Sequence, residues 1–558
     1  MMKKICLALA ISGLFSISNA FAQSLISYED LSYYERLSLE DALASDEPDS
    51  VFAIQIWGEN YDATYISDST QVSEEILKFH NLQILEINDQ LATLIAPNLD
   101  KFPLLQVLTL RNVGLAEFPE SVYSLKNLKR LYLQDLGSWE MNAEKLAGNQ
   151  IVALDLSRVG SSCDDDTLDC EHDIENFPHL QELTMNGNVY NVPHGVYGLK
   201  ELRYLDISNC NIKSISPEIG NLSSLESLTI GSLSELESLP DEIGNLKSLI
   251  TLDASGCGFT ELPKGIQGCT NLESLILNNT AVLEVPDWIG ELTELRTLNV
   301  ASAFVSTVSE NISNCTQLSS IYLWNNTLTE FPKVLFQIPA LETIDLAGNS
   351  ISEIPAGMDA LPALNSLDMS NNPIRKIAPD AFISTSLNFL SLSGCNLHTL
   401  PDMSGLSNLN SLDLTDDSLS EFPVSVLKLI NLNQLNLNYN QIKILPASGW
   451  GYLSSLGSLS LSQNNITVFP SDIYSLMSLY SLDISNNQIK KLPKGIGKMS
   501  NLGWVRVYGN KGILLPKDLK NLNEHLVTFQ ISTKDITPKN LAKLRKMIPE
   551  DKLELYEY

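Results

Sequence analysis

The chain has 558 residues, and its 67 acidic against 36 basic side chains give a formal net charge of −31. A chain this negative repels nucleic-acid phosphates and anionic lipid headgroups, which excludes both as expected partners. The charge is unevenly distributed: residues 23–78 hold 13 acids and 2 bases, whereas residues 490–558 hold 7 acids and 14 bases. We therefore expect one strongly negative end and one positive end.

The first segment has the features of an export signal. Two lysines precede an apolar stretch over residues 5–18, and Ala-Phe-Ala at 20–22 matches a signal-peptidase site. Because this stretch is too short to span a bilayer, residues 1–22 are predicted to be a signal peptide, with a buried first helix as the alternative. No later segment has about 18 uninterrupted apolar residues, so no integral membrane segment is expected. The protein is predicted to be periplasmic, secreted or at the cell surface.

From residue 82 onward one leucine pattern recurs, L-x-x-L-x-L-x-x-N-x-L-x-x-L-P-x-x-I-x-x-L. One copy places Leu341, Ile344, Leu346 and Asn349 in this frame, and the next copy begins at Leu364. Twenty units start at Leu82, Leu105, Leu128, Ile151, Leu180, Leu202, Leu225, Leu249, Leu272, Leu295, Leu318, Leu341, Leu364, Leu387, Leu409, Leu432, Leu456, Leu479, Leu502 and Leu526. All spacings but one lie between 22 and 24 residues, which indicates a repeat architecture.

This pattern resembles the leucine-rich-repeat family over about residues 80–548. The L-P-x-x-I segments, such as residues 239–243 and 492–496, are similar to the 23-residue class of plant ras-group and many bacterial proteins. The resemblance implies an α/β fold: a right-handed, curved horseshoe solenoid with a parallel sheet on its concave face. About 20 repeats with N- and C-terminal caps are expected.

The repeat itself explains why it folds only as an array. The last two leucines of L-x-x-L-x-L alternate with polar residues, which is the period of a strand with one buried face. Stacking neighbouring units buries leucines that a single unit would expose. The asparagine is expected to bond backbone groups of its own turn and of the neighbouring unit, forming a ladder. The proline disfavours helix, so short helical turns and extended segments are expected on the outer side.

Both ends depart from the pattern, as terminal repeats must. Residues 23–81 are predicted to form an acidic N-terminal cap region with one further inner strand around residues 51–56. The solenoid proper is assigned to residues 82–548 and a C-terminal cap strand to 549–558, with a helix and a last strand expected over 543–555. The first four units lack the asparagine, and a less regular N-terminal quarter is therefore expected; the residues at its position are Gln90, Val113, Leu136 and Val159.

The cysteines fall into two groups. Five occupy asparagine or outer leucine positions and are expected to be buried packing residues: Cys210, Cys257, Cys395, Cys269 and Cys315. Cys163 and Cys170 instead lie in the one 29-residue unit, and in an oxidising compartment they are predicted to form a disulfide. The six carboxylates of residues 164–173 leave calcium binding open beside a solvated acidic turn, and C-x6-C is unlike usual zinc pairs, so no metal site is assigned.

No enzymatic function is predicted. The sequence has no G-x-S-x-G elbow, no phosphate-binding glycine loop and no H-E-x-x-H, and no cofactor is expected. A column of aspartates follows the strands, but it has no base or nucleophile beside it, and aspartate is ordinary in an L-D-L-S context. The column comprises Asp155, Asp206, Asp253, Asp345, Asp368, Asp413 and Asp483.

Function is therefore expected on the concave face, where repeat solenoids hold partners. Aromatic residues and arginine, which dominate binding hot spots, occur there in places. The predicted binding residues are Tyr480, Trp504, Arg506, Tyr508, Tyr439, Tyr322 and Trp324. A protein partner is predicted, with glycan binding or adhesion as the alternative. Packing of the end-repeat aromatics against the cap would instead give them a purely structural role.

Overall fold

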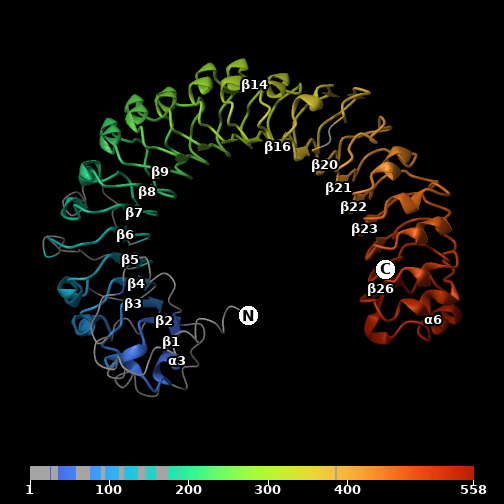
Figure 1. Cartoon of the computed structure of the whole chain (residues 1–558), viewed down its shortest axis with the longest axis horizontal. Helices are drawn as coiled ribbons and strands as arrows, with labels where there is room; N and C mark the ends of the chain where they lie inside the picture. Colours follow the sequence, from blue (N-terminus) through green and yellow to red (C-terminus); the bar gives the residue numbers. More distant parts are fainter. Residues whose placement is uncertain are drawn as a thin grey trace, which may run out of the picture. The chain divides into compact units, whose positions relative to one another are not determined.

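The computed structural model describes residues 26, 36–57, 76–88, 95–111, 118–135, 145, 148–158, 174–187, 189–383 and 386–557. The chain forms two compact units. The first is Met1–Gly258 with Pro263–Cys269, and the second is Phe259–Leu262 with Thr270–Tyr558. Within each unit one motif recurs: a short strand, a tight turn and a return segment, which in most repeats contains one turn of 3-10 helix (Figure 1).

The strands of the first unit pair in parallel, each with the strand of the next repeat. They are β1 (Leu37–Ser38), β2 (Ala53–Trp57), β3 (Ile84–Asn88), β4 (Val107–Arg111), β5 (Arg130–Gln134), β6 (Ala153–Asp155), β7 (Glu182–Thr184), β8 (Tyr204–Asp206), β9 (Ser227–Thr229) and β10 (Thr251–Asp253). The predicted further strand ahead of the first repeat is confirmed as β2. Strands β3, β4 and β5 have five residues each, whereas β6 to β10 have three.

Within the second unit the strands pair in parallel in the same way. Its strands are β11 (Ser274–Ile276), β13 (Thr297–Asn299), β15 (Ser320–Tyr322), β16 (Thr343–Asp345), β18 (Ser366–Asp368), β20 (Phe389–Ser391), β21 (Ser411–Asp413), β22 (Gln434–Asn436), β23 (Ser458–Ser460), β24 (Ser481–Asp483), β25 (Trp504–Arg506), β26 (Thr528–Ser532) and β27 (Leu553–Tyr556). In this unit the strands from β16 to β26 lie on the inner side of the curve and the helical turns on the outer side (Figure 1).

The outer side consists of single 3-10 turns and short extended pieces, as predicted. In the first unit the turns are η1 (Pro48–Ser50), η3 (Ala96–Lys101), η4 (Glu120–Ser124), η7 (Ile174–Asn176), η8 (His194–Gly198), η9 (Pro217–Asn221), η10 (Asp241–Asn245) and η11 (Lys264–Gly268). In the second they are η12 (Asp287–Glu291), η13 (Glu310–Asn314), η14 (Lys333–Gln337), η15 (Met358–Ala360), η16 (Val424–Lys428), η17 (Trp450–Tyr452), η18 (Ser471–Ser475), η19 (Ile496–Lys498), η20 (Lys517–Leu522) and η21 (Glu550–Lys552).

Proline sets where these turns begin. Pro240 immediately precedes η10 with φ −65° and ψ 150°, an extended conformation, and Pro286 precedes η12 in the same way. Because the proline ring fixes φ and disfavours helix in the preceding residue, neither of these two turns begins before its proline. Two pairs of outer strands complete this side: β12 (Glu284–Val285) with β14 (Thr307–Val308), and β17 (Glu353–Ile354) with β19 (Lys376–Ile377).

The core lies between the strands and the outer turns. In β16 the side chain of Ile344 is fully buried, whereas Thr343 and Asp345 on either side are partly exposed. Parallel pairing keeps Ile344 opposite Leu367 of the next repeat, so buried side chains stack from unit to unit. This stacking explains why the repeat is stable only as an array.

Buried asparagines form the predicted ladder beside the core of the second unit. Asn349 accepts the backbone N–H of Leu328 at its Oδ1 (3.0 Å) and donates from Nδ2 to the carbonyls of Leu323 (2.9 Å) and Leu346 (3.0 Å). Each rung therefore makes two hydrogen bonds to the preceding repeat and one within its own. The same arrangement holds at Asn326, Asn372, Asn440, Asn464, Asn487 and Asn510. Asn188, which the repeat of Leu180 places at the same position, lies outside the described residues.

Each end of the described chain carries an α-helix. In the first unit α3 (Leu39–Leu43) begins at Ser38, whose hydroxyl accepts the N–H of Asp41. In the second unit α6 (Pro538–Leu544) begins at Thr537, whose hydroxyl accepts the N–H of Asn540. This helix ends where the sequence predicts one to start, around residue 543, because proline at its first position and the threonine cap fix its beginning earlier. The expected last strand is present as β27, which pairs with β26.

Candidate binding surface

The aspartate column on the inner sheet surface has a local structural role. Asp345 Oδ1 accepts the backbone N–H of Ala347 at 3.0 Å, and Asp368 Oδ1 accepts that of Ser370 at 2.8 Å. A short side chain that bonds the backbone two residues ahead forms an Asx turn. The column therefore shapes the turn after each strand. The same bond is made by Asp155, Asp206, Asp253, Asp413 and Asp483.

The five cysteines at repeat positions are buried and free, as predicted. At the ladder position the Cys257 thiol donates to the carbonyl of Ile230 (3.1 Å), the bond that asparagine makes elsewhere. At the outer leucine position the Cys269 thiol donates to Ile243 (3.2 Å). Burial raises the pKa of Cys257 and of Cys269 to about 11, so both thiols stay protonated and unreactive at neutral pH.

Residues of β25 and its turn alternate as the register predicts. Val505 and Val507 are fully buried, Trp504 is 42% exposed, and Arg506 and Tyr508 are partly exposed. Trp504, Arg506 and Tyr508 therefore share the inner face of the sheet, since successive side chains of a strand point to opposite faces. Of these three, Trp504 presents the large apolar surface that the fold leaves uncovered.

Tyr480 does not lie directly opposite Trp504. Trp504 lies opposite Ser481 in the sheet, so Tyr480 precedes β24 and stands beside Gly503. Its ring covers Gly457 of the preceding repeat, where an added Cβ would meet the ring's Cε1 at 2.6 Å. The ring remains 44% exposed. Glycine at 457 is what allows a flat aromatic ring to lie on the sheet edge here.

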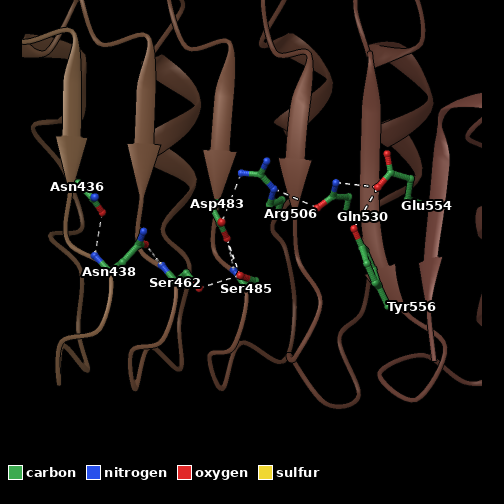
Figure 2. A network of polar contacts seen from close by, with 9 residues as sticks. All are labelled: Asn436, Asn438, Ser462, Asp483, Ser485, Arg506, Gln530, Glu554 and Tyr556. Atoms are coloured by element: carbon green, nitrogen blue, oxygen red, sulfur yellow. Dashed lines mark hydrogen bonds and ion pairs between the residues drawn. The ribbon is translucent and has the colours of Figure 1, made fainter. Parts of the chain in front are cut away.

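Arg506 lies within a polar network that crosses six strands of the second unit (Figure 2). Its Nε donates to Gln530 Oε1 (3.0 Å), and its Nη1 lies 3.7 Å from Asp483 Oδ2. Gln530 in turn donates to Glu554 of β27 (2.8 Å), which also accepts the hydroxyl of Tyr556. Arg506 is thus held by an acidic and an amide partner, and it stiffens the surface beside Trp504 more than it offers a free charge.

The network continues toward the middle of the unit. Asp483 accepts the hydroxyl of Ser485 (2.6 Å), which is hydrogen-bonded to the hydroxyl of Ser462 (2.8 Å). The N–H of Ser462 donates to Asn438, whose own N–H donates to Asn436 (Figure 2). These bonds fix the polar inner face from β22 to the C-terminal cap.

Tyr508 packs against the C-terminal cap. Its ring centroid lies 5.3 Å from that of Tyr556 in β27. The alternative that the end-repeat aromatics pack against the cap therefore applies to Tyr508. Trp504 and Tyr480 are the large aromatics of this end that stay substantially exposed.

The other predicted binding residues are spread over the second unit. Tyr439 lies in the turn after β22 and is 57% exposed. Tyr322 ends β15, and Trp324, which is 38% exposed, follows two residues later. Tyr322 and Trp324 belong to the repeat of Leu318, whereas Trp504 belongs to the repeat of Leu502. The predicted residues thus form separate patches on the inner face.

A further group of exposed apolar residues was missed by the sequence reasoning. Ile444, Val468 and Leu514 are 76%, 68% and 51% exposed and precede the L/F-P step of their repeats. Ile444 and Val468 are bridged in parallel, as are Lys491 and Leu514. Other repeats place glutamate here, as at Glu421, so the change from charged to apolar was visible in the sequence.

Two predictions about sites fall on residues outside the described ones. These are the signal peptide of residues 1–22 and the acidic loop with Cys163 and Cys170. Among the described residues, no group of three or more His, Cys, Asp or Glu side chains is arranged to hold a metal ion. Within the same part of the chain, no helix is both long and apolar enough to span a membrane.

Stacked repeats, a parallel inner sheet and an asparagine ladder define a repeat solenoid. Three family models for leucine-rich repeats match the chain. The first, described as Leucine Rich Repeat, matches residues 201–222, and the second, Leucine-rich repeat region, matches residues 232–321. The third, Leucine rich repeat, matches residues 316–374, 407–466 and 430–489. The chain belongs to the leucine-rich-repeat family, and its fold is the leucine-rich-repeat solenoid.

Solved structures share this fold. A leucine-rich-repeat protein of Leptospira interrogans is 27% identical with a TM-score of 0.58, covering 83% of this chain and 97% of that one. TLR13, solved in complex with ssRNA13, is 22% identical with a TM-score of 0.60, covering 86% of this chain and 70% of that one. The second similarity shows the fold alone.

A curated relative from Arabidopsis thaliana, protein SUPPRESSOR OF npr1-1, CONSTITUTIVE 1, is 27% identical over 194 residues. The match covers 33% of this chain and only 12% of that relative's length.

Proposed function

We propose that this chain is an exported, non-enzymatic binding protein that holds a protein partner on the inner face of its second unit. The contact is centred on Trp504 and Tyr480. The single observation that carries the proposal is their exposure, 42% and 44%, on a sheet surface whose neighbouring strands are joined by the polar contacts of Arg506. Rigid aromatic side chains lose little entropy on binding and dominate interface hot spots.

The inner face around them suits a partner that brings polar groups. Serines occupy the first strand position of the neighbouring repeats, at Ser458 and Ser481, and Asp483 follows in β24. A hydrophobic anchor surrounded by hydrogen-bonding groups is the ordinary composition of a protein interface. The role of Arg506 in this proposal is to position the surface through Asp483 and Gln530.

Site-specific photocrosslinking tests the proposal. We expect a photoreactive phenylalanine analogue at position 504 to trap one protein repeatedly in the source cells. The matched control is the same analogue at Tyr452, which is 70% exposed and belongs to the outer turn η17. Trapping at 452 and not at 504 would overturn the inner-face assignment.

Glycan binding is a second candidate, and it is favoured by the ring of Tyr480 lying over Gly457. A flat ring with one open face can stack on the apolar face of a sugar. A glycan array probed with the full chain and with Tyr480→Ala separates the candidates. The glycan candidate would be favoured if the full chain binds the array, Tyr480→Ala does not, and no protein is crosslinked at position 504.

Export is a separate part of the proposal and has its own test. We propose that residues 1–22 are a signal peptide and that the mature chain begins at Gln23. N-terminal sequencing of protein recovered from the periplasm, cell surface or medium should start at Gln23. A mature protein that retains Met1 and stays inside the cell would contradict this.

A further inference from the structure

The asparagine ladder of the second unit is replaced at two neighbouring rungs. Cys395 and Asp417 stand between Asn372 and Asn440. Cys395 preserves the rung, because its thiol donates to the carbonyl of Met369 at 3.2 Å. Asp417 differs, because an ionised carboxylate has oxygen acceptors and no proton to donate.

One carboxylate oxygen of Asp417, Oδ1, makes the hydrogen bonds expected at a ladder position. Oδ1 accepts the backbone N–H groups of Cys395 and Leu397, both at 3.0 Å, much as Asn440 Oδ1 accepts that of Leu419. Oδ2 is buried and has no hydrogen-bond partner, and the residue as a whole is only 6% exposed. A buried polar atom without a hydrogen-bond partner lowers the free energy of unfolding, so the surroundings of Oδ2 require an explanation.

The repeat identifies what Oδ2 faces. Asn440 Nδ2 donates to the carbonyls of Leu414 (2.7 Å) and Leu437 (3.3 Å), one in the preceding repeat and one in its own. By the same register, Oδ2 of Asp417 lies where Nδ2 would meet the carbonyls of Leu392 and Leu414. An oxygen without a proton repels those carbonyls, whereas a protonated Oδ2 can donate its one proton to one of them.

We propose that Asp417 is a proton-dependent rung, which closes the ladder between the repeats of Leu387 and Leu409 when protonated and opens it when ionised. The groups that face it are Asp413 and Asp416 from its own repeat, Cys395 from the preceding repeat and the uncharged Asn440 from the following one. The two neighbouring carboxylates favour the neutral form of Asp417.

The direction of the pH effect follows from the geometry. The pKa of Asp417 is raised to about 7: burial raises it most, the backbone bonds from Leu397 and Cys395 lower it, and the charges of Asp416 and Asp413 raise it. An unfolded aspartate titrates near pH 3.9, so the folded chain binds more protons between about pH 4 and pH 7. The free energy of unfolding therefore falls as pH rises through this window and levels off above it.

Thermal unfolding of the full chain between pH 5 and pH 8.5 tests the proposal. Asp417→Asn restores the amide rung, so we expect its Tm at pH 8 to exceed that of the natural chain by about 2 °C or more, with a flatter pH profile. Asn440→Asp moves the same chemistry to the next rung and should steepen the profile. Asp380→Asn, which removes an exposed carboxylate, is the matched charge control and should run parallel to the natural chain.

Hydrogen exchange localises the effect and keeps the test decisive if a variant folds poorly. After correction for intrinsic rates, amides between residues 392 and 417 should lose protection from pH 5.5 to pH 8 in the natural chain. Equal pH slopes of Tm for the natural chain and Asp417→Asn, or pH-independent protection of this segment, would overturn the proposal.

Discussion

In the turn after the strand, one residue of many repeats has a left-handed backbone conformation, which restricts the residue types that fit there. Asn325, Asn371 and Asn486 have φ of 57°, 55° and 50° there, and Gly348 has 66°. Asparagine and glycine tolerate this conformation. Tyr439 holds the same position with φ 56°, although a bulky side chain disfavours it. Since its ring is 57% exposed, the fold gains little burial in return.

Replacing this tyrosine should stabilise the protein. We predict that Tyr439→Asn raises the free energy of unfolding by about 0.5–1 kcal/mol, because it relieves the left-handed strain at a compatible site. Chemical denaturation of the two chains measures the difference. Gln463→Asn, at the equivalent position of the next repeat with φ 57°, is the matched control and should change stability less. A loss of stability in Tyr439→Asn would show that the ring contributes packing.

At the scale of the element, the outer turns pack closely enough to require glycine. A Cβ at Gly268 in η11 would lie 2.6 Å from the Cα of Gly244 in η10. In the second unit, a Cβ at Gly497 in η19 would lie 2.2 Å from the carbonyl oxygen of Asp518 in η20. Glycine at these positions therefore allows successive outer turns to pack closely.

The one oversized repeat carries an element-scale prediction about Cys163 and Cys170. In the exported protein we expect these residues to be bonded to each other, stabilising the chain by about 2–3 kcal/mol through loop closure. Mass spectrometry of an unreduced digest should find a crosslinked peptide that separates on reduction. The five buried cysteines provide the internal control and should react with thiol reagents only after unfolding. Free thiols at both 163 and 170 would contradict the prediction.

At the scale of the whole chain, the charge asymmetry predicts weak self-association. The acidic residues 23–78 of one molecule should attract the lysine-rich residues 490–558 of another. Exposed charges are screened over about 8–10 Å at physiological ionic strength, so the association should weaken as salt is added. Sedimentation at low and high salt measures it. A monomer at high protein concentration in both conditions would exclude head-to-tail contact.

The fold was predictable from the sequence because every repeat places its leucines at the same positions of the strand and turn. The strands at 84–88 and 528–532, the buried Val505 and Val507, and the outer 3-10 turns all followed from it. Cross-strand partners follow from the same frame, since aligning Leu479 with Leu502 pairs Ser481 with Trp504, as the sheet has it. Tyr480 therefore aligns with Gly503, one position ahead of that pair.

The state of the candidate site depended on contacts that no local pattern contains. Arg506 was predicted as a binding residue, but its contacts with Asp483 and Gln530 come from neighbouring strands and are not visible in its own repeat. Tyr508 looked like part of the binding surface, although it packs on Tyr556. The irregular rung at residue 417 was visible in the sequence as aspartate in an asparagine position, but its unpartnered Oδ2 became apparent only from its burial.

The most direct test of the central claim is the affinity of Trp504→Ala for the protein trapped at position 504. Truncation of a hot-spot tryptophan should cost about 2 kcal/mol or more, which raises Kd by about 30-fold, while circular dichroism and Tm stay close to those of the natural chain. Tyr452→Ala, on the outer side, should leave Kd unchanged. An unchanged Kd for Trp504→Ala, or unfolding of the C-terminal repeats with binding retained elsewhere, would contradict the assignment of the inner face as the binding surface.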